Sequence, residues 1–447
     1  MPRTVIIGNG VAGISCARKL RQLAVEESIS VISSESEYFF SRTALMYVYM
    51  GHMRWQDLEP YERQSWPQQG IECILARVAK IDFDERTLML DNGQKMGYDR
   101  LILATGSVPN RFGWPGEELR GVTGFYSKQD LEHIELLTPG IRRAVIVGGG
   151  LIGIELAEMF HSRNIPVTML VREQQYWSSV LPVEEAQMIS AHIRNKGIDL
   201  RLGVELKELE GDDDSRVCAV HTLEGDRIEC NFVGLTAGVR PNIDWLKGGP
   251  LETDRGILVD SLLRTNIPGV YAIGDCAQLR KPSEGRKSVE AVWYSGRKMG
   301  ECLALNLAGR ETPYDPGIWF NSAKFFDIEH QVYGSILPTP SPGTNSILWN
   351  HPASDRSIRI VYDTATGCLT GINLMGVRFR HEVCDKWLRE KTQVEHVLSN
   401  IRLAFFDPEF FPDFAPPLLE AYSQKTGRQL RLHSPDKLSD VLRFLRS

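Results

Sequence analysis

The sequence lacks the patterns that mark several large classes of protein. Its eight cysteines are scattered through the 447 residues, and no two of them form a C-x-x-C or another close pair. This spacing argues against a zinc finger or a thioredoxin-type site. No apolar run approaches the roughly 20 residues that a membrane-spanning helix needs. A net charge of −6 without a long basic run argues against a primary nucleic-acid-binding protein.

The sequence also predicts a cytoplasmic protein without a targeting segment or a metal site. Scattered single cysteines are typical of buried thiols in a reducing cytoplasm. A strand pattern begins at Thr4, so we expect no targeting segment before it. His381, Glu382 and Cys384 share one predicted helix, but no second ligand pair lies at metal spacing, so we expect no metal site.

A glycine-rich turn occurs twice in the sequence. G-N-G-V-A-G, residues 8–13, lies between an apolar strand pattern at 4–7 and a helical pattern at 14–23. G-G-G-L-I-G, residues 148–153, lies between a strand pattern at 144–147 and a helical pattern at 154–160. In G-x-G-x-x-G the first glycine makes the tight turn, the second admits a pyrophosphate and the third lets helix and strand pack. Two copies in this context predict two dinucleotide-binding folds.

The residues that follow each turn bear on which nucleotide binds. Glu35 lies 22 residues beyond Gly13, where an acidic side chain binds a ribose hydroxyl. After the second turn, Val171 occupies the corresponding acidic position and Arg172 follows it. A guanidinium suits a 2′-phosphate, so this pattern favours NADPH over NADH, although Glu173 is adjacent.

Further motifs place the chain near a known group of flavoproteins. Ala104-Thr105-Gly106, Ala237-Gly238 and the segment T-N-I-P-G-V-Y-A-I-G-D, residues 265–275, follow the turns in order. This order resembles the two-dinucleotide-domain flavoprotein superfamily over about residues 1–335. Residues 39–45, F-F-S-R-T-A-L, resemble the Y-x-R-x-x-L segment of ferredoxin, rubredoxin and monodehydroascorbate reductases.

The resemblance implies an α/β protein with two Rossmann-like domains and a C-terminal α+β domain. We expect an FAD-binding domain at 1–112 and 256–310 and an NAD(P)-binding domain at 113–255. The third domain, 311–447, is expected to form the interface of a homo-oligomer, and its aromatic segment, F-F-D-P-E-F-F at 405–411, to pack against other protein.

The resemblance also implies roles for individual residues. Gly8, Gly10 and Gly13 would hold the FAD pyrophosphate, Glu35 the adenosine ribose, Arg42 the phosphates and Asp275 a ribitol hydroxyl. The full set expected to bind FAD is Gly8, Gly10, Val11, Ala12, Gly13, Glu35, Arg42, Val78, Ala104, Thr105, Gly106, Gly274 and Asp275. The set expected to bind the nicotinamide nucleotide is Gly148, Gly150, Ile152, Gly153, Glu155, Arg172 and Gly238.

Three departures from the resembling enzymes concern the flavin. Residues 37–52 contain no cysteine, so we expect no redox-active disulfide there. Tyr47 occupies the position where those reductases carry a basic residue beside the glutamate equivalent to Glu155. We therefore expect Tyr47 and Glu155 to be catalytic, with Glu155 readily protonated because it lacks a cation. The alternative is that Tyr47 only packs and Glu155 is solvated. The third departure is at residues 319–322, which read W-F-N-S. The resembling ferredoxin reductases carry W-F-W-S there, so Asn321 replaces a tryptophan.

The predicted function is hydride transfer from NAD(P)H to FAD, followed by electron transfer to an external acceptor. The acceptor could be an iron–sulfur protein, a quinone or dioxygen, and the sequence leaves these open. The alternative is a non-enzymatic flavoprotein, similar to apoptosis-inducing factor, whose cofactor state controls oligomerisation or partner binding.

Overall fold

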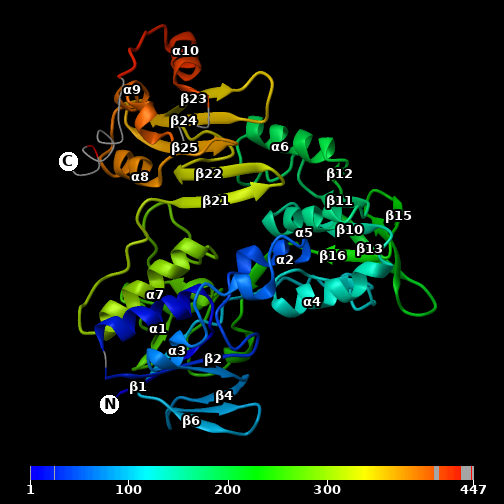
Figure 1. The fold of residues 1–447 in the computed structure, drawn as a ribbon, viewed down its shortest axis with the longest axis vertical. Coiled ribbons are helices and arrows are strands. Elements are labelled where there is room, and N and C mark those ends of the chain that lie inside the picture. The colour runs from blue at the N-terminus through cyan, green and yellow to red at the C-terminus, as the bar shows by residue number, and fades with distance from the viewer. Residues whose placement is uncertain (1, 25, 407–411, 434–443, 445–447) are drawn as a thin grey trace.

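The computed structural model describes residues 2–24, 26–406, 412–433 and 444. Two parallel sheets and one antiparallel sheet form three regions, with the antiparallel sheet stacked above the other two (Figure 1). This architecture confirms the predicted α/β fold with a C-terminal α+β domain.

The first region is built on a parallel sheet of order β19-β7-β1-β2-β3. Its strands are continuous apolar runs because both faces of a parallel sheet are covered, and α1 and α7 pack together on one of them. Its principal elements are β1 (Arg3–Ile7), α1 (Val11–Leu23), β2 (Ser28–Ser33), α2 (Leu45–Tyr49), α3 (Ser65–Gln68), β3 (Ile71–Leu75), β7 (Arg100–Leu103), β8 (Ser107–Pro109), β18 (Ile257–Val259), β19 (Val270–Ala272), β20 (Ala277–Leu279) and α7 (Trp293–Leu307). A small antiparallel sheet is added by β4 (Val78–Asp82), β5 (Thr87–Leu90) and β6 (Lys95–Gly97).

The second region repeats the design with a parallel sheet of order β12-β11-β10-β16-β9. Its elements are β9 (Val122–Thr123), α4 (Lys128–Leu137), β10 (Ala144–Val147), α5 (Leu151–Ser162), β11 (Val167–Val171), α6 (Val183–Asn195), β12 (Asp199–Leu202), β13 (Leu206–Gly211), β14 (Val217–Thr222), β15 (Arg227–Glu229), β16 (Phe232–Leu235) and β17 (Val239–Pro241). The chain crosses between the first two regions at β8 and β17, which pair with each other. The residue boundaries of the domains stay a prediction.

The third region is an antiparallel sheet of order β21-β22-β25-β24-β23 with helices against it. Its elements are β21 (Phe320–Phe325), β22 (Ile328–Gly334), β23 (Thr344–Asn350), β24 (Ser357–Asp363), β25 (Leu369–Met375), α8 (His381–Arg389), α9 (Val394–Ser399) and α10 (Ala415–Thr426). In the predicted aromatic segment, Phe405 packs against Phe379 and Phe414, whereas Phe406 is 46% exposed. Residues 407–411 lie outside the described residues.

Both helices that follow the glycine turns begin earlier than predicted. Helix α1 starts at Val11 rather than at residue 14, and α5 starts at Leu151 rather than at residue 154. The third glycine of each turn therefore lies inside the first helical turn. The helical spacing of apolar residues misses this turn because glycine and small residues occupy it.

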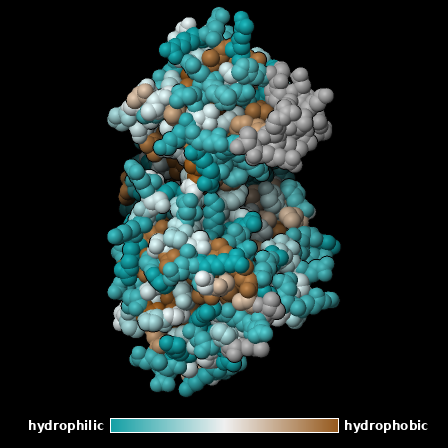
Figure 2. Space-filling model, turned by 90° about the vertical axis from the view of Figure 1, so that its left-hand side faces the viewer, coloured by the Kyte–Doolittle hydropathy of each residue, from teal (hydrophilic) through white to brown (hydrophobic). Residues whose placement is uncertain are grey.

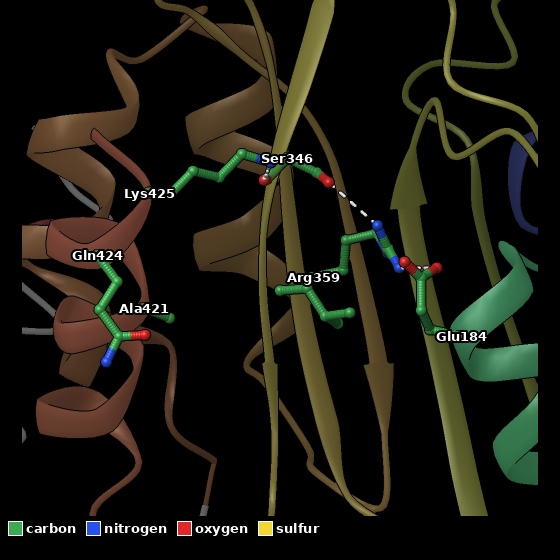
Figure 3. A pocket seen from close by; sticks show the side chains of 7 residues that line it. Glu184, Ser346, Arg359, Ala421, Gln424 and Lys425 are labelled. Atoms are coloured by element: carbon green, nitrogen blue, oxygen red, sulfur yellow. Dashed lines mark hydrogen bonds and ion pairs between the residues drawn. The ribbon is translucent and has the colours of Figure 1, made fainter. Parts of the chain in front are cut away.

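The third region is joined to the second by a buried ion pair. Arg359 of β24 donates from Nε to Oε1 of Glu185 on α6 at 2.7 Å. It also donates to Glu184 at 2.8 Å and to Ser346 at 3.0 Å (Figure 3). A cavity of about 370 Å³ lies beside this joint, but the guanidinium on its wall is already paired with glutamates.

The outer surface is mostly polar. Figure 2 looks onto the side of the molecule that is on the left in Figure 1, where α1 and α7 lie, and shows hydrophobic groups among hydrophilic ones. No helix within the described part of the chain is long and apolar enough to cross a membrane.

Candidate functional site

The first glycine turn has the geometry of a phosphate cradle. Gly8 has φ +114°, and a Cβ there would overlap the carbonyl oxygen of Ala104. A Cβ on Gly13 would overlap the carbonyl oxygen of Gly8, whereas a Cβ on Gly10 would meet nothing within 4 Å. The first and third glycines are therefore fixed by packing, and the second borders open space, as pyrophosphate binding requires.

The start of α1 adds an electrostatic component to this cradle. Gly10 is its N-cap and no side chain caps the first turn. The N–H groups of such a turn and the helix dipole favour a negative charge. The residues present therefore fit the pyrophosphate of a dinucleotide, with Val11 and Ala12 in the turn that would face it.

The second turn repeats this geometry at the start of α5. Gly148 has φ +132° and lies against Thr236, and a Cβ on Gly153 would be 2.6 Å from the carbonyl oxygen of Gly148. Gly150 again borders open space and is the uncapped N-terminus of the helix. Ile152 lies in the first turn, and Gly238, with φ +88°, lies in the turn that follows β16.

Glu35 and Arg42, predicted to bind ribose and phosphate, form an ion pair with each other. Glu35 Oε1 accepts from Arg42 Nη1 at 2.9 Å and from the backbone N–H of Lys128 at 2.8 Å. Arg42 also donates to the carbonyl oxygen of Tyr126 at 2.6 Å. The pair thus links the first region to α4 of the second, a role that the sequence did not indicate.

Asp275 lies in the turn that follows β19, close to this pair. Its Oδ2 accepts from Ser107 Oγ at 2.9 Å. Burial raises the pKa of Asp275, and the hydrogen bond from Ser107 and the charge of Arg42 partly offset that rise. The turn is held against α1 because Gly274 sits beside Ala12. A carboxylate in this place can accept a hydrogen bond from a ribitol hydroxyl.

The remaining predicted residues lie at the ends of strands. Ala104, Thr105 and Gly106 follow β7, and Thr105 Oγ1 donates to the carbonyl oxygen of Asn242 at 2.9 Å. Val78 is the buried first residue of β4. Arg172 follows β11, is exposed, and donates from Nε to Glu173 at 3.1 Å.

Comparison with known proteins decides the family. Residues 2–300 match the pyridine nucleotide-disulphide oxidoreductase family. The chain belongs to this family. It is 31% identical to the ferredoxin reductase subunit of 5,5'-dehydrodivanillate O-demethylase from Sphingobium sp., over 80% of this chain and 86% of that protein. It is 28% identical to monodehydroascorbate reductase 3 from Arabidopsis thaliana, over 90% of this chain and 96% of that protein.

Solved structures agree with this assignment. A ferredoxin reductase from Rhodopseudomonas palustris superposes with a TM-score of 0.77 at 26% identity, over 84% of this chain and 91% of that one. The predicted superfamily and enzyme class are confirmed. This pyridine nucleotide-disulphide oxidoreductase is an NAD(P)H-dependent, FAD-containing oxidoreductase.

No disulfide joins the thiols of this oxidoreductase, although Cys218 and Cys230 are neighbours in space: the backbone N–H of Cys230 donates to the carbonyl oxygen of Cys218 at 3.1 Å. All eight cysteines are free. Burial raises the pKa of seven of these thiols, namely those of Cys16, Cys73, Cys218, Cys230, Cys276, Cys302 and Cys384. A raised pKa keeps a thiol protonated and a poor nucleophile. Among the described residues, no group of three or more His, Cys, Asp or Glu side chains could hold a metal ion.

The surroundings of Glu155 correct one prediction. The site does contain a cation: Lys324 of β21 reaches α5 and donates from Nζ to Oε1 of Glu158 at 2.7 Å. The same ammonium lies 5.4 Å from the ring centroid of Tyr47. Lys324 lies two residues beyond the W-F-N-S segment, residues 319–322, and no local pattern marks it as a partner of these glutamates.

Glu155 is nevertheless readily protonated, as predicted. Burial raises its pKa to about 7, the negative charge of Glu158 adds to the rise, and Lys324 opposes it. Tyr47 makes no hydrogen bond to Glu155 within the described part of the chain, and its ring stacks on His52 at 6.2 Å between centroids. The joint role of Tyr47 and Glu155 in catalysis stays a prediction.

Proposed function

We propose that this oxidoreductase passes electrons from NAD(P)H through FAD directly to an external one-electron redox protein, without a redox-active disulfide. The observation that carries the proposal is the absence of any cysteine from residues 37–52, together with the free state of all eight thiols. In the resembling thiol enzymes the reactive cysteines lie in the segment that residues 37–52 occupy here, whereas the neighbouring Cys218 and Cys230 lie at the small antiparallel sheet of the second region.

The residues of the two turns would bind and orient the cofactors. The turn at Gly8–Gly13 would hold the FAD pyrophosphate, and the turn at Gly148–Gly153 that of the nicotinamide nucleotide. FAD, when bound, accepts a hydride from the nicotinamide and releases electrons singly or in pairs. Orientation of the two rings is the main contribution of the protein to this transfer.

A redox protein as acceptor is supported by two observations. One relative is named as a ferredoxin reductase subunit, and a solved structure similar to this chain is named as a ferredoxin reductase. In addition, a groove of about 340 Å³ between α1 and α7 is lined by Arg18 and Lys19, by Arg297 in its ion pair with Glu301, and by the exposed Trp293. Basic and aromatic side chains of this kind suit an acidic protein surface.

The acceptor is tested by measuring NADPH-driven reduction of an acidic iron–sulfur protein, a neutral quinone and dioxygen. We expect the iron–sulfur protein to be reduced fastest and its rate alone to fall steeply with added salt, because only its docking is electrostatic. Lys19→Glu should lower the rate at which the iron–sulfur protein is reduced and leave the rate of quinone reduction unchanged. Lys207→Glu, an equal charge change on the distant β13, is the control. Faster reduction of quinone or dioxygen, without a salt effect, would refute the proposal.

We also propose that Arg172 favours NADPH over NADH. Its guanidinium is exposed and held only by a surface ion pair with Glu173, which costs little to break. Arg172→Ala should lower kcat/KM for NADPH by about tenfold and leave that for NADH unchanged. Arg201→Ala, on the neighbouring β12, is the control. A preference for NADH that Arg172→Ala does not alter would show that this assignment is wrong.

Two further expectations remain proposals of the same kind. The C-terminal domain is expected to form a homo-oligomer, and the protein to reside in the cytoplasm. The scattered free thiols support the second expectation, because a reducing compartment keeps such thiols free.

A further inference from the structure

Helix α5 carries two glutamates, one turn apart, with different surroundings. Glu158 is buried and its Oε1 accepts from Lys324 Nζ at 2.7 Å. Glu155 is half-buried and accepts no hydrogen bond from any residue that the structure describes. Residues three apart lie on the same side of a helix, so both carboxylates share one small volume with one ammonium group.

Lys324 connects the three regions of the molecule at this point. It belongs to β21 of the C-terminal sheet, and β21 packs against α5 of the second region. Its ammonium also lies 5.4 Å from the ring centroid of Tyr47, on α2 of the first region. The apolar cluster around α5 likewise contains Leu45 from α2 and Phe325 from β21.

The other titratable groups near Glu155 can be named element by element. Helix α2 contributes Tyr47. The segment after β11 contributes Tyr176, whose hydroxyl donates to the carbonyl oxygen of Gly150 at 2.5 Å and whose pKa is raised by burial and by the charge of Glu155. Strands β10 and β11, which also pack against α5, have the sequences A-V-I-V and V-T-M-L-V and carry no charge. Among the described residues, Lys324 is therefore the cation that faces the two carboxylates.

Two carboxylates and one ammonium group give this cluster a net charge of −1 unless one carboxylate binds a proton. Glu158 accepts a hydrogen bond from Lys324, which stabilises its ionised form. Glu155 has no such bond within the described part of the chain, so the repulsion between the two carboxylates favours the protonated form of Glu155. Removing the ammonium would remove an attraction that favours the ionised form of Glu155. The ion pair contributes less to stability than a fully buried one, because the lysine side chain is 34% exposed although that of Glu158 is only 10% exposed.

We propose that Lys324, held in place by Glu158, is a positioning residue that sets whether Glu155 is ionised beside the nicotinamide. The C-terminal sheet would thereby control the start of α5, where the second glycine turn binds its nucleotide. This inference rests on the proposed function for the position of the nicotinamide, but the charge coupling among the three side chains does not.

The test follows the protonation of Glu155 in the FAD-loaded enzyme. A protonated carboxyl group absorbs in the infrared apart from carboxylates, and the band absent from Glu155→Gln identifies Glu155. In Lys324→Gln we expect the midpoint of this band to move upward by about one pH unit. The pH dependence of flavin reduction by NADPH should move with it. Lys324→Arg should retain the wild-type midpoint.

Two further variants separate charge from structure. Tyr47→Lys combined with Lys324→Gln places the ammonium on the other side of the same volume and should return the midpoint toward the wild-type value. Lys207→Gln, an exposed lysine on β13, should leave it unchanged.

An unchanged midpoint in Lys324→Gln, with FAD still bound, would overturn the inference, and so would an equal shift in Lys207→Gln. If NADPH and NADH both fail to reduce the wild-type flavin, the proposed function fails. The infrared midpoints would then still decide the charge coupling.

Discussion

Two cations of the C-terminal sheet meet glutamate pairs on helices of the second region, and the two contacts differ. Arg359 meets Glu184 and Glu185 on α6, where Glu185 is fully buried and both of its oxygens accept from the guanidinium. Lys324 meets Glu158 on α5, whereas Glu155 accepts no hydrogen bond from the residues that the structure describes. At Arg359, both carboxylate oxygens of Glu185 accept hydrogen bonds. At Lys324, the carboxylate of Glu155 accepts none from the described residues.

The difference indicates which contact is structural and which is functional. A buried ion pair whose hydrogen bonds are all made fixes the orientation of two domains and has no capacity for a further ligand. A carboxylate with a raised pKa and open hydrogen-bonding capacity, at the start of a helix that binds a nucleotide, is typical of a site of chemistry. Four predictions test this contrast.

The largest effect is expected from breaking the contact between Arg359 and Glu185. Arg359→Met leaves Glu185 buried without its cation and should lower the free energy of unfolding by about 3–5 kcal/mol. Chemical denaturation followed by circular dichroism measures this. Adding Glu185→Met to Arg359→Met should recover much of the loss, because no buried charge then remains.

A matched control is the exposed pair of Arg264 and Asp260, whose side chains are 53% and 37% exposed. Arg264→Met should change stability by less than about 1 kcal/mol. Equal losses in the two arginine variants would mean that the contact at Arg359 is not specially stabilising.

An intermediate effect is expected at Glu155, beside the contact between Lys324 and Glu158. Glu155→Gln should slow flavin reduction by NADPH about ten- to a hundredfold at pH 6, while FAD stays bound. The wild-type rate should fall as the pH rises through about 7, the pKa of Glu155, and the variant should lack this transition. Stopped-flow absorbance across the pH range measures both, and identical profiles would exclude Glu155 from the chemistry.

The same raised pKa predicts the sign of a stability change. The folded-state pKa of Glu155, about 7, lies above its value of 4.5 in the unfolded chain, so stability is lost as the pH rises from 4.5 through about 7. Glu155→Gln should therefore stabilise the protein at pH 8 relative to the wild type, and this gain should vanish as the pH falls below the unfolded value of 4.5. A variant that is destabilised equally at pH 8 and below pH 4.5 would contradict this sign.

The smallest effect on stability is expected from Lys324. Lys324→Gln should lower the free energy of unfolding by less than about 1 kcal/mol, because its ion pair is partly exposed to solvent. A loss as large as that of Arg359→Met would make the two contacts equivalent and remove the contrast between them.

Much of the fold and of the nucleotide turns could be predicted from sequence. The turns at Gly8–Gly13 and Gly148–Gly153 are local: a strand, a glycine turn and a helix follow one another within about 20 residues. Packing against the chain fixes Gly8 and Gly13 and leaves Gly10 open, as the motif requires.

Contacts between regions could not be predicted in this way. Lys324 and Glu158 meet only because β21 packs on α5, and no local pattern marks either residue as a partner of the other. Similarly, the sequence indicated Glu35 and Arg42 as separate cofactor ligands, but the fold turns them toward each other and toward Lys128. Such pairings depend on the relative placement of domains, which single-sequence periodicity does not contain.

The central claim is that electrons pass through the flavin alone, and counting them tests it most directly. The purified, FAD-loaded enzyme is titrated anaerobically with NADPH and then with dithionite, and the absorbance of the flavin is followed to completion. We predict that two electrons per FAD reduce the enzyme fully. Uptake of four electrons per FAD by a metal-free preparation would reveal a second redox centre, such as a cysteine pair, and would contradict the account.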